Sequence, residues 1–153
     1  MQATGKKLKV LFLCTGNSCR SQMAEGWARY LMDDLIEPYS AGIEKHGLNN
    51  KAVEVMSEAG VDISGHRSKT LDELDDVEFD YLVTVCGHAN EMCPVFPARV
   101  RKEHWPLADP AKAEGTEEEI MNTFRAARSE IRRRVHGLLE RLYNETYDMG
   151  RDK

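Results

Sequence analysis

The sequence lacks the long apolar runs and the basic charge that mark several large classes of protein. Its 153 residues contain no apolar stretch that approaches the length of a membrane span. The run 8–13 is too short for the core of a secretion signal, and Lys9 interrupts it. A net charge of −5 argues against general nucleic-acid binding. We therefore expect a cytoplasmic protein that has neither a membrane nor a nucleic acid as its partner.

Paired cysteines are also missing, since none of the four cysteines belongs to a C-x-x-C pair. In a cytosolic chain, cysteines are more often catalytic or metal-binding than members of structural disulfides. A zinc site would draw on Cys86, Cys93, His88 and His104, whose spacing matches no common zinc module. We therefore expect no metal and consider the cysteines as catalytic groups.

No linker, repeat or low-complexity tract divides the chain, so we expect a single domain over 1–153. Strands are predicted at 7–13, 39–41, 79–86 and 100–105. Helices are predicted at 21–33, from a cap at Asn49 or Asn50 to a stop at Gly60, at 71–74, and from Thr116 onward. Strands that alternate with helices predict an α/β fold built on a parallel sheet.

The loop Cys14-Thr-Gly-Asn-Ser-Cys-Arg20-Ser21 joins the first strand to the first helix. A strand–loop–helix turn points successive N–H groups at one spot, and the positive end of the helix lies there too. Together with an arginine, these donors make a site for a tetrahedral oxyanion. We predict that the anion is bound by Thr15, Gly16, Asn17, Ser18, Cys19, Arg20 and Ser21.

Cys14 is the predicted nucleophile, because it lies in the floor of this anion site. The donors and the positive charge stabilise a thiolate, so the thiol is expected to lose its proton easily. Arg20 is expected to hold two oxygens in a bidentate grip. Asn17 tolerates a positive φ and shapes the loop, and Ser21 is placed to donate its hydroxyl to the Cys14 sulfur. For Cys19 we expect a role of the backbone N–H rather than of the sulfur.

Three further residues are candidates for the same edge of the sheet. Cys86 ends its strand much as Cys14 ends the first, and ligands of parallel sheets bind beyond the carboxyl ends of the strands. Cys93 follows after a short polar segment, at a separation that permits a disulfide with Cys86. Asp109 precedes Pro110 and is predicted to protonate a leaving oxygen.

These residues leave two kinds of enzyme open. Phosphoryl transfer needs only Cys14, Arg20 and Asp109, whereas Cys86 and Cys93 on the same edge permit redox chemistry. A third possibility is a module that senses an anion or a metal with the same thiols. The sequence motifs alone therefore predict a thiolate and an oxyanion, and the extra cysteines favour a reductase.

The whole set of motifs resembles the thioredoxin-coupled arsenate reductases, a branch of the low-molecular-weight protein tyrosine phosphatase fold. The resemblance covers nearly the whole chain. It is carried by Cys14-Thr-Gly-Asn-Ser-Cys-Arg-Ser-Gln-Met-Ala-Glu-Gly26, Tyr39-Ser-Ala-Gly42, Cys86-Gly87 through Cys93-Pro94, and Glu103-His-Trp105 to Asp109-Pro110. It implies an α/β fold of three layers, in which helices flank a four-stranded parallel sheet.

The resemblance also implies a reaction that serves arsenic detoxification. Cys14 attacks arsenate, Cys86 attacks the arseno-cysteine adduct, and arsenite leaves behind a Cys14–Cys86 disulfide. Cys93 then attacks Cys86, and thioredoxin reduces the Cys86–Cys93 bond. It implies no tightly bound cofactor, phosphate or sulfate as mimics of arsenate, and a monomer. The alternative within the same fold is a phosphatase that acts on phosphotyrosine or on small phosphoesters.

Two positions depart from relatives of this kind. Some members hold potassium near the loop with residues that match Asn17, Glu25, Ser40 and an Asp, but the last position here is Lys69. We expect the Lys69 ammonium to take the place of the cation. Tyrosine phosphatases of this fold typically place an aromatic residue after Asp-Pro, whereas here Ala111 follows. A small oxyanion suits that position better than a phosphotyrosine.

Overall fold

The structure is a computed structural model that describes residues 7–32, 34–87 and 100–151. Cys93 and His88 therefore lie outside the described residues. The strands are β1 (Leu8–Cys14), β2 (Ile36–Gly42), β3 (Tyr81–Thr84) and β4 (Arg101–His104). The helices are α1 (Arg20–Met32), α2 (Asn50–Glu58) and α4 (Glu117–Arg151), with short 3-10 helices η1 (Leu71–Leu74) and η2 (Pro110–Lys112).

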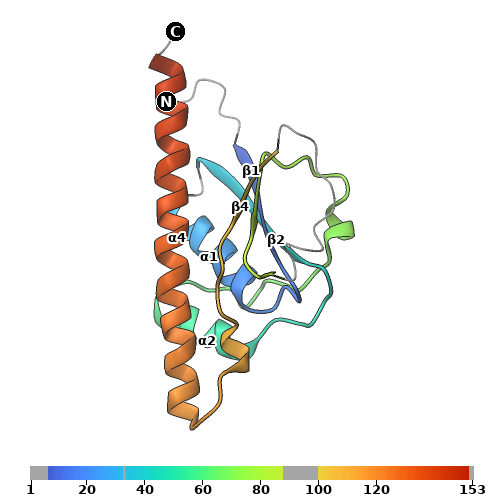
Figure 1. Ribbon diagram of the computed structural model, residues 1–153, viewed down its shortest axis with the longest axis vertical. Helices are drawn as coiled ribbons and strands as arrows, with labels where there is room; N and C mark the ends of the chain where they lie inside the picture. Colours follow the sequence, from blue (N-terminus) through green and yellow to red (C-terminus); the bar gives the residue numbers. More distant parts are fainter. Residues whose placement is uncertain (1–6, 33, 88–99, 152–153) are drawn as a thin grey trace.

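The four strands form one parallel sheet in the order β2-β1-β3-β4. Figure 1 shows α1, α2 and α4 gathered on one side of the sheet, with η1 on the opposite side of the view from α4. The predicted α/β fold, a four-stranded parallel sheet flanked by helices, is confirmed. β1 and β3 are neighbours, so the residues that follow them emerge at the same edge of the sheet.

The strands differ in length from the prediction for physical reasons. β1 is an interior strand whose residues 10–13 are fully buried, and the prediction of 7–13 matches it closely. β2 begins at Ile36, earlier than predicted, and contains Pro38. Proline is tolerated in strands at the edges of sheets, and β2 is an edge strand. β3 is shorter than the predicted 79–86 at both ends, although the N–H groups of Asp80 and Val85 on either side of it still donate to β1 carbonyls, at 2.8 and 2.9 Å.

The helix ends follow the predicted capping residues. The Asn49 side chain accepts hydrogen bonds from the N–H groups of Lys51 and Ala52, and so begins α2. Gly60 has φ of 85° and follows the C-terminal end of that helix. At the start of α4, Thr116 and Glu119 exchange hydrogen bonds between side chain and backbone, which is the predicted capping box.

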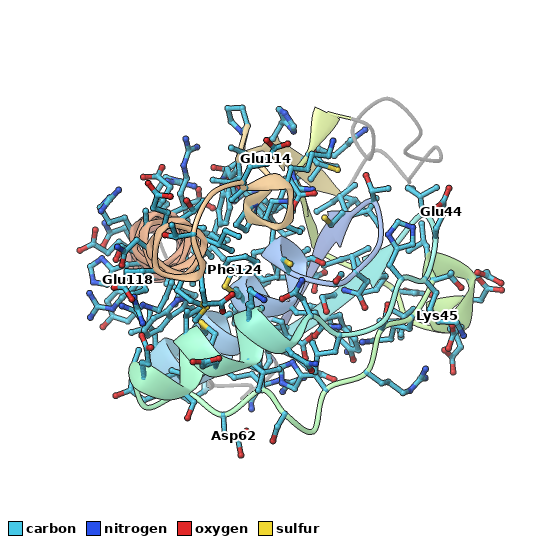
Figure 2. All side chains as sticks on the ribbon, turned by 90° about the horizontal axis from the view of Figure 1, so that it is seen from below. Glu44, Lys45, Asp62, Glu114, Glu118 and Phe124 are labelled. Carbon is cyan, nitrogen blue, oxygen red and sulfur yellow. The ribbon has the colours of Figure 1, made fainter. Side chains whose placement is uncertain are left out.

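α4 covers the helical side of the core with one apolar face. Its buried residues include Phe124, Ile131, Val135, Leu138 and Leu142. Figure 2 shows Phe124 turned toward the interior, whereas Glu118 points outward. Among the described residues, no helix combines the length and the apolar character that a membrane crossing requires. α4 is long, but its opposite face is charged.

Candidate active site

The loop between β1 and α1 is held by its carbonyl groups. Four of them accept hydrogen bonds from backbone N–H groups of the segment 43–49: Ile43 to Cys14 (3.1 Å), Glu44 to Thr15 (2.8 Å), His46 to Gly16 (3.0 Å) and Asn49 to Ser18 (3.1 Å). Gln22 donates to the Asn17 carbonyl, and the Met23 N–H donates to that of Cys19. Figure 2 places Glu44 of this segment on the other side of the molecule from α4.

The N–H groups of the loop are consequently left for a ligand. No described residue accepts a hydrogen bond from the N–H groups of residues 16–19. The carbonyls are satisfied on the outside of the loop, and consecutive N–H groups in such a turn converge on one point. The N-terminal end of α1 adds a positive partial charge there. The loop therefore has the geometry of an anion cradle, and the binding of an oxyanion by residues 15–21 stays a prediction.

Asn17 fixes the shape of this cradle from within. It is fully buried and has φ of 51°, the only non-glycine residue with positive φ in the described chain. Its Oδ1 accepts hydrogen bonds from Gln22 Nε2 and from the Lys69 N–H, both at 2.9 Å. Its Nδ2 donates to Ser21 Oγ at 2.9 Å. Because Ser21 Oγ is an acceptor in that bond, its own hydrogen is available to another acceptor.

Arg20 reaches across the cradle to the loop after β4. Its Nη1 donates to the Leu107 carbonyl at 2.9 Å, and its Nη2 lies 3.5 Å from Asp109 Oδ2. The guanidinium is buried, yet its Nε has no hydrogen-bond partner among the described residues. A buried donor without an acceptor is rare in native proteins. An oxyanion in the cradle would supply that acceptor, so the residues present fit the predicted ligand.

Asp109 is brought to the cradle by the short helix η2. Its Oδ1 accepts a hydrogen bond from the Ala111 N–H at 3.0 Å, which caps η2. Its Oδ2 is the atom that faces Arg20. The Asp-Pro turn thus holds one carboxylate oxygen and leaves the other facing Arg20 beside the cradle.

Cys86 lies beside Cys14 at the same edge of the sheet. The register of β1 and β3 pairs Leu13 with Thr84, so both chains leave the sheet at the same level. The Cys86 sulfur is 3.1 Å from Thr15 Oγ1, and the thiols of Cys14 and Cys86 are themselves hydrogen-bonded. The structure therefore brings Cys14, Arg20, Cys86 and Asp109 together.

The protonation of Cys14 corrects one expectation. The hydrogen bond with Cys86 and burial raise the pKa of the Cys14 thiol far above its ordinary value, although Arg20 and the Thr15 N–H oppose them. The expected easy loss of the proton is therefore wrong for this arrangement. The physical reason is that the hydrogen bond to Cys86 and burial both favour the neutral Cys14 thiol over the charged thiolate.

The other loop cysteine has a different environment. Burial, and then the charge of Asp109, raise the pKa of Cys19 to about 11. A thiol with such a pKa is almost entirely protonated at neutral pH and is a poor nucleophile. This agrees with the expectation that Cys19 contributes its backbone N–H rather than its sulfur.

Lys69 supports the cradle from outside. Its N–H binds Asn17, and its ammonium donates to the Arg67 carbonyl at 3.2 Å. Burial lowers the pKa of Lys69, whereas the nearby carboxylate of Glu25 acts in the opposite direction. Glu25 is buried and accepts hydrogen bonds from Ser40 Oγ at 2.6 Å and from Arg29. The Lys69 ammonium thus lies in the field of Glu25, one of the residues that match the potassium ligands of some relatives.

Several residues that shape the site were not predicted from the sequence. The segment 43–49 is one, and Ser68, whose hydroxyl donates to the Gly16 carbonyl at 2.9 Å, is another. A signal was present at Gly42, where an added Cβ would lie 2.3 Å from the Glu44 carbonyl oxygen. Only glycine allows the chain to approach itself so closely at that point.

The structure gives no support to the zinc alternative in the part of the chain that it covers. No group of three or more potential metal ligands occurs among the described residues. The imidazole of His104 is hydrogen-bonded to Thr84 Oγ1 at 2.8 Å.

A parallel sheet with this loop after its first strand is the arrangement that we compared with known protein families. The chain belongs to the low molecular weight phosphotyrosine protein phosphatase family, whose model matches residues 9–147.

Particular relatives within that family are arsenate reductases. The chain is 50% identical over 134 residues to an arsenate reductase of Halalkalibacterium halodurans, covering 88% of this chain and 96% of the relative. It is 32% identical to the structure of an arsenate reductase in the phosphate binding state, with a TM-score of 0.73, covering 88% and 98% of the two chains. A thioredoxin-dependent arsenate reductase of Corynebacterium glutamicum is 27% identical, with a TM-score of 0.69, over 94% of this chain and 65% of that one.

Proposed function

We propose that this chain reduces arsenate to arsenite through a three-thiol relay that thioredoxin regenerates. The chain is an arsenate reductase of the low molecular weight phosphatase family. The observation that carries the relay is the contact between the thiols of Cys14 and Cys86 at the anion cradle. Hydrolysis of a phosphoester needs one nucleophilic thiol, whereas reduction by two electrons needs a second thiol within reach of the first.

In the first step, the Cys14 sulfur attacks the arsenic atom of arsenate. The N–H groups of the loop and the Nε of Arg20 bind the arsenate oxygens. These donors stabilise the negative charge on the oxygens in the transition state. Asp109 transfers a proton to the leaving oxygen, which departs as water. A covalent Cys14–arsenate adduct remains. The proton of the Cys14 thiol, whose pKa the hydrogen bond to Cys86 raises, must be released before or during this attack.

In the second step, the Cys86 thiolate attacks the Cys14 sulfur of the adduct. A sulfur–sulfur bond forms, the sulfur–arsenic bond breaks, and its electron pair stays on arsenic. Arsenic(V) is thereby reduced to arsenic(III), which leaves as arsenite, and two thiols are oxidised to one disulfide. The placement of Cys86 beside Cys14 supports this step, because the attack needs no large movement of β3.

In the third step, we propose that Cys93 attacks Cys86 and releases Cys14 as a thiolate. The new Cys86–Cys93 disulfide is then reduced by the dithiol of thioredoxin, which takes up the oxidation. Cys93 lies outside the described residues, so its role rests on the sequence. The thioredoxin-dependent relative supports the choice of reductant. No tightly bound cofactor enters any of these steps.

Phosphate-ester hydrolysis is a second candidate, because the family includes phosphotyrosine phosphatases. The cradle, Arg20 and Asp109 suffice for it, and phosphate has the shape and charge of arsenate. Ala111, which follows Pro110, has a small side chain and offers no ring on which a phosphotyrosine could stack. We therefore expect weak activity toward small phosphoesters beside the main reaction.

The direct test is arsenate-dependent oxidation of NADPH in the presence of thioredoxin and thioredoxin reductase. We expect sustained turnover with this pair and little turnover with glutaredoxin and glutathione. Turnover with glutaredoxin alone would overturn the proposed reductant. Absence of turnover with both donors would overturn the reductase assignment.

A further inference from the structure

A second group of polar side chains lies where α1, α2 and α4 meet, and the reaction above does not use it. It surrounds a pocket of about 340 Å³ lined by Trp27, Tyr30, Ala59, Arg128, Ser129 and Arg132. A volume of this size is at the lower end of the range of small-molecule sites. Trp27 is seven residues along α1 from Arg20, or about 10 Å along the helix axis. The pocket is therefore separate from the anion cradle, although both use α1.

The indole of Trp27 lacks a partner for its polar atom. The side chain is 4% exposed, and its Nε1 is buried without a hydrogen-bond partner among the described residues. The other tryptophan of the chain provides the contrast, because Trp105 Nε1 donates to Glu103 Oε2 at 2.9 Å. Buried polar groups in native proteins are almost always satisfied by protein, water or ligand. The Trp27 N–H is thus a donor that needs an acceptor from outside the described chain.

Arg132 also lacks a described polar partner, unlike its described arginine neighbours on α4. Its guanidinium lies over the Trp27 ring, 5.4 Å from the centroid, and forms no ion pair with a described carboxylate. The described neighbours on the helix are paired: Arg125 and Arg128 with Glu58, Arg133 and Arg134 with Glu130, and Arg141 with Glu103. A guanidinium that stacks on an aromatic face keeps its N–H edge available for a planar anion.

The remaining walls add a paired arginine and an exposed ring. Arg128 is ion-paired with Glu58, which also binds Arg125. Tyr30 is 59% exposed and is one of two large hydrophobic side chains so exposed in the described chain. Its ring meets that of Trp27 edge to face, at 5.8 Å between centroids. The pocket walls therefore combine an arginine without a described ion pair, an indole whose buried N–H has no described partner, and an exposed aromatic ring.

We propose that this pocket binds a small organic anion whose carboxylate is attached to an aromatic ring. The carboxylate accepts hydrogen bonds from the N–H edge of Arg132 and from the Trp27 indole. The ring of the ligand packs against Tyr30. A bare tetrahedral oxyanion would satisfy the donors but would leave the tyrosine ring uncovered, so the ring and the charge together define the ligand class.

The test follows the two indole N–H signals of the full chain by ¹H–¹⁵N NMR during titration with benzoate. We expect the Trp27 signal to shift saturably, with a Kd of about 1 mM or lower, and the Trp105 signal to stay in place. Benzamide, the neutral analogue, should bind at least about tenfold more weakly, because charge-assisted hydrogen bonds are lost. A Trp27 shift that is absent, does not saturate or is equally large with benzamide would overturn the proposal. So would inorganic phosphate or an acidic peptide of aspartates that shifts Trp27 at lower concentration than benzoate does.

Two variants on the same helix provide a matched pair. Arg132→Gln should weaken benzoate binding about tenfold and leave arsenate turnover unchanged, since Arg132 is exposed and remote from the cradle. Arg133→Gln removes an arginine that already pairs with Glu130, and it should leave benzoate binding unchanged. Circular dichroism checks that both variants are folded. Equal effects of the two substitutions on benzoate binding would overturn the role of Arg132.

Discussion

β1 and β3 deliver two thiols to the same edge of the sheet, but the chain after each strand is built differently. After Cys14, each carbonyl from residue 14 to residue 19 is hydrogen-bonded to a neighbouring segment or to the start of α1. After the buried Cys86 comes Gly87, where an added Cβ would meet no described atom within 4 Å. The loop after β1 is thus held by hydrogen bonds, whereas the described chain leaves space around the residue that follows Cys86. We therefore assign anion binding to the loop after β1 and the transfer of electrons to the cysteine after β3.

Of the substitutions that separate the roles of the two strand ends, we expect Cys86→Ser to have the largest effect on arsenate turnover. Arsenate turnover with thioredoxin should fall at least about 1000-fold, because the second thiol of the redox reaction is gone. Hydrolysis of p-nitrophenyl phosphate should change less than about threefold, since it uses Cys14, Arg20 and Asp109 but not Cys86. Parallel assays of the two activities on one protein preparation check this. Equal losses would show that the two strand ends do not have separate roles.

Arg20→Lys should damage both activities together. Lysine has no planar fork, and it cannot replace both the contact with Leu107 and the free Nε. We expect kcat/KM to fall about 100-fold or more for arsenate and for p-nitrophenyl phosphate alike, as when a donor to an oxyanion is removed. Steady-state kinetics with both substrates measure this, with Arg133→Lys as a control. A loss confined to arsenate would contradict a common anion site.

The structure also predicts how the two thiols depend on pH. The hydrogen bond to Cys86 is the largest cause that raises the pKa of Cys14, so Cys86→Ala should lower that pKa. A lower pKa means more thiolate at a given pH, and alkylation of Cys14 by iodoacetamide should become at least about tenfold faster near about pH 8. Mass spectrometry assigns the alkylated residue, and Cys19→Ala serves as the control. Alkylation that is unchanged or slower would contradict the role of Cys86 in raising the pKa of Cys14.

The smallest effect concerns the cation beside the cradle. We propose that the Lys69 ammonium, which lies in the field of Glu25, takes the place of a metal cation near Asn17. We expect arsenate turnover in potassium and in sodium chloride at equal ionic strength to agree within about twofold. A steep rise that is specific to potassium would contradict this role of Lys69.

The local features of this site were predictable from the sequence. The buried strand β1, the cradle at residues 15–21 and the positive φ of Asn17 follow from short-range patterns, because neighbouring residues determine them. The capping residues Asn49 and Thr116 are local in the same sense. The parallel sheet followed from the alternation of strands with helices.

Features that depend on distant contacts were not predictable in this way. The raised pKa of Cys14 arises from Cys86, which is far away in the sequence and is brought near only by the pairing of β1 with β3. The support of the loop by residues 43–49 requires the position of β2. The environment of Trp27, beneath Arg132 of another helix, appears only once α1 and α4 are packed.

The central claim is that Cys14 and Cys86 act in sequence on one arsenate. Its most direct test is a single turnover of the Cys93→Ser variant with arsenate and no reductant, followed by measurement of arsenite and of disulfides by mass spectrometry. We expect about one arsenite per protein molecule and a Cys14–Cys86 disulfide, because the relay stops where Cys93 should act. Absence of arsenite, or a disulfide between Cys14 and Cys19 in place of Cys14–Cys86, would contradict it.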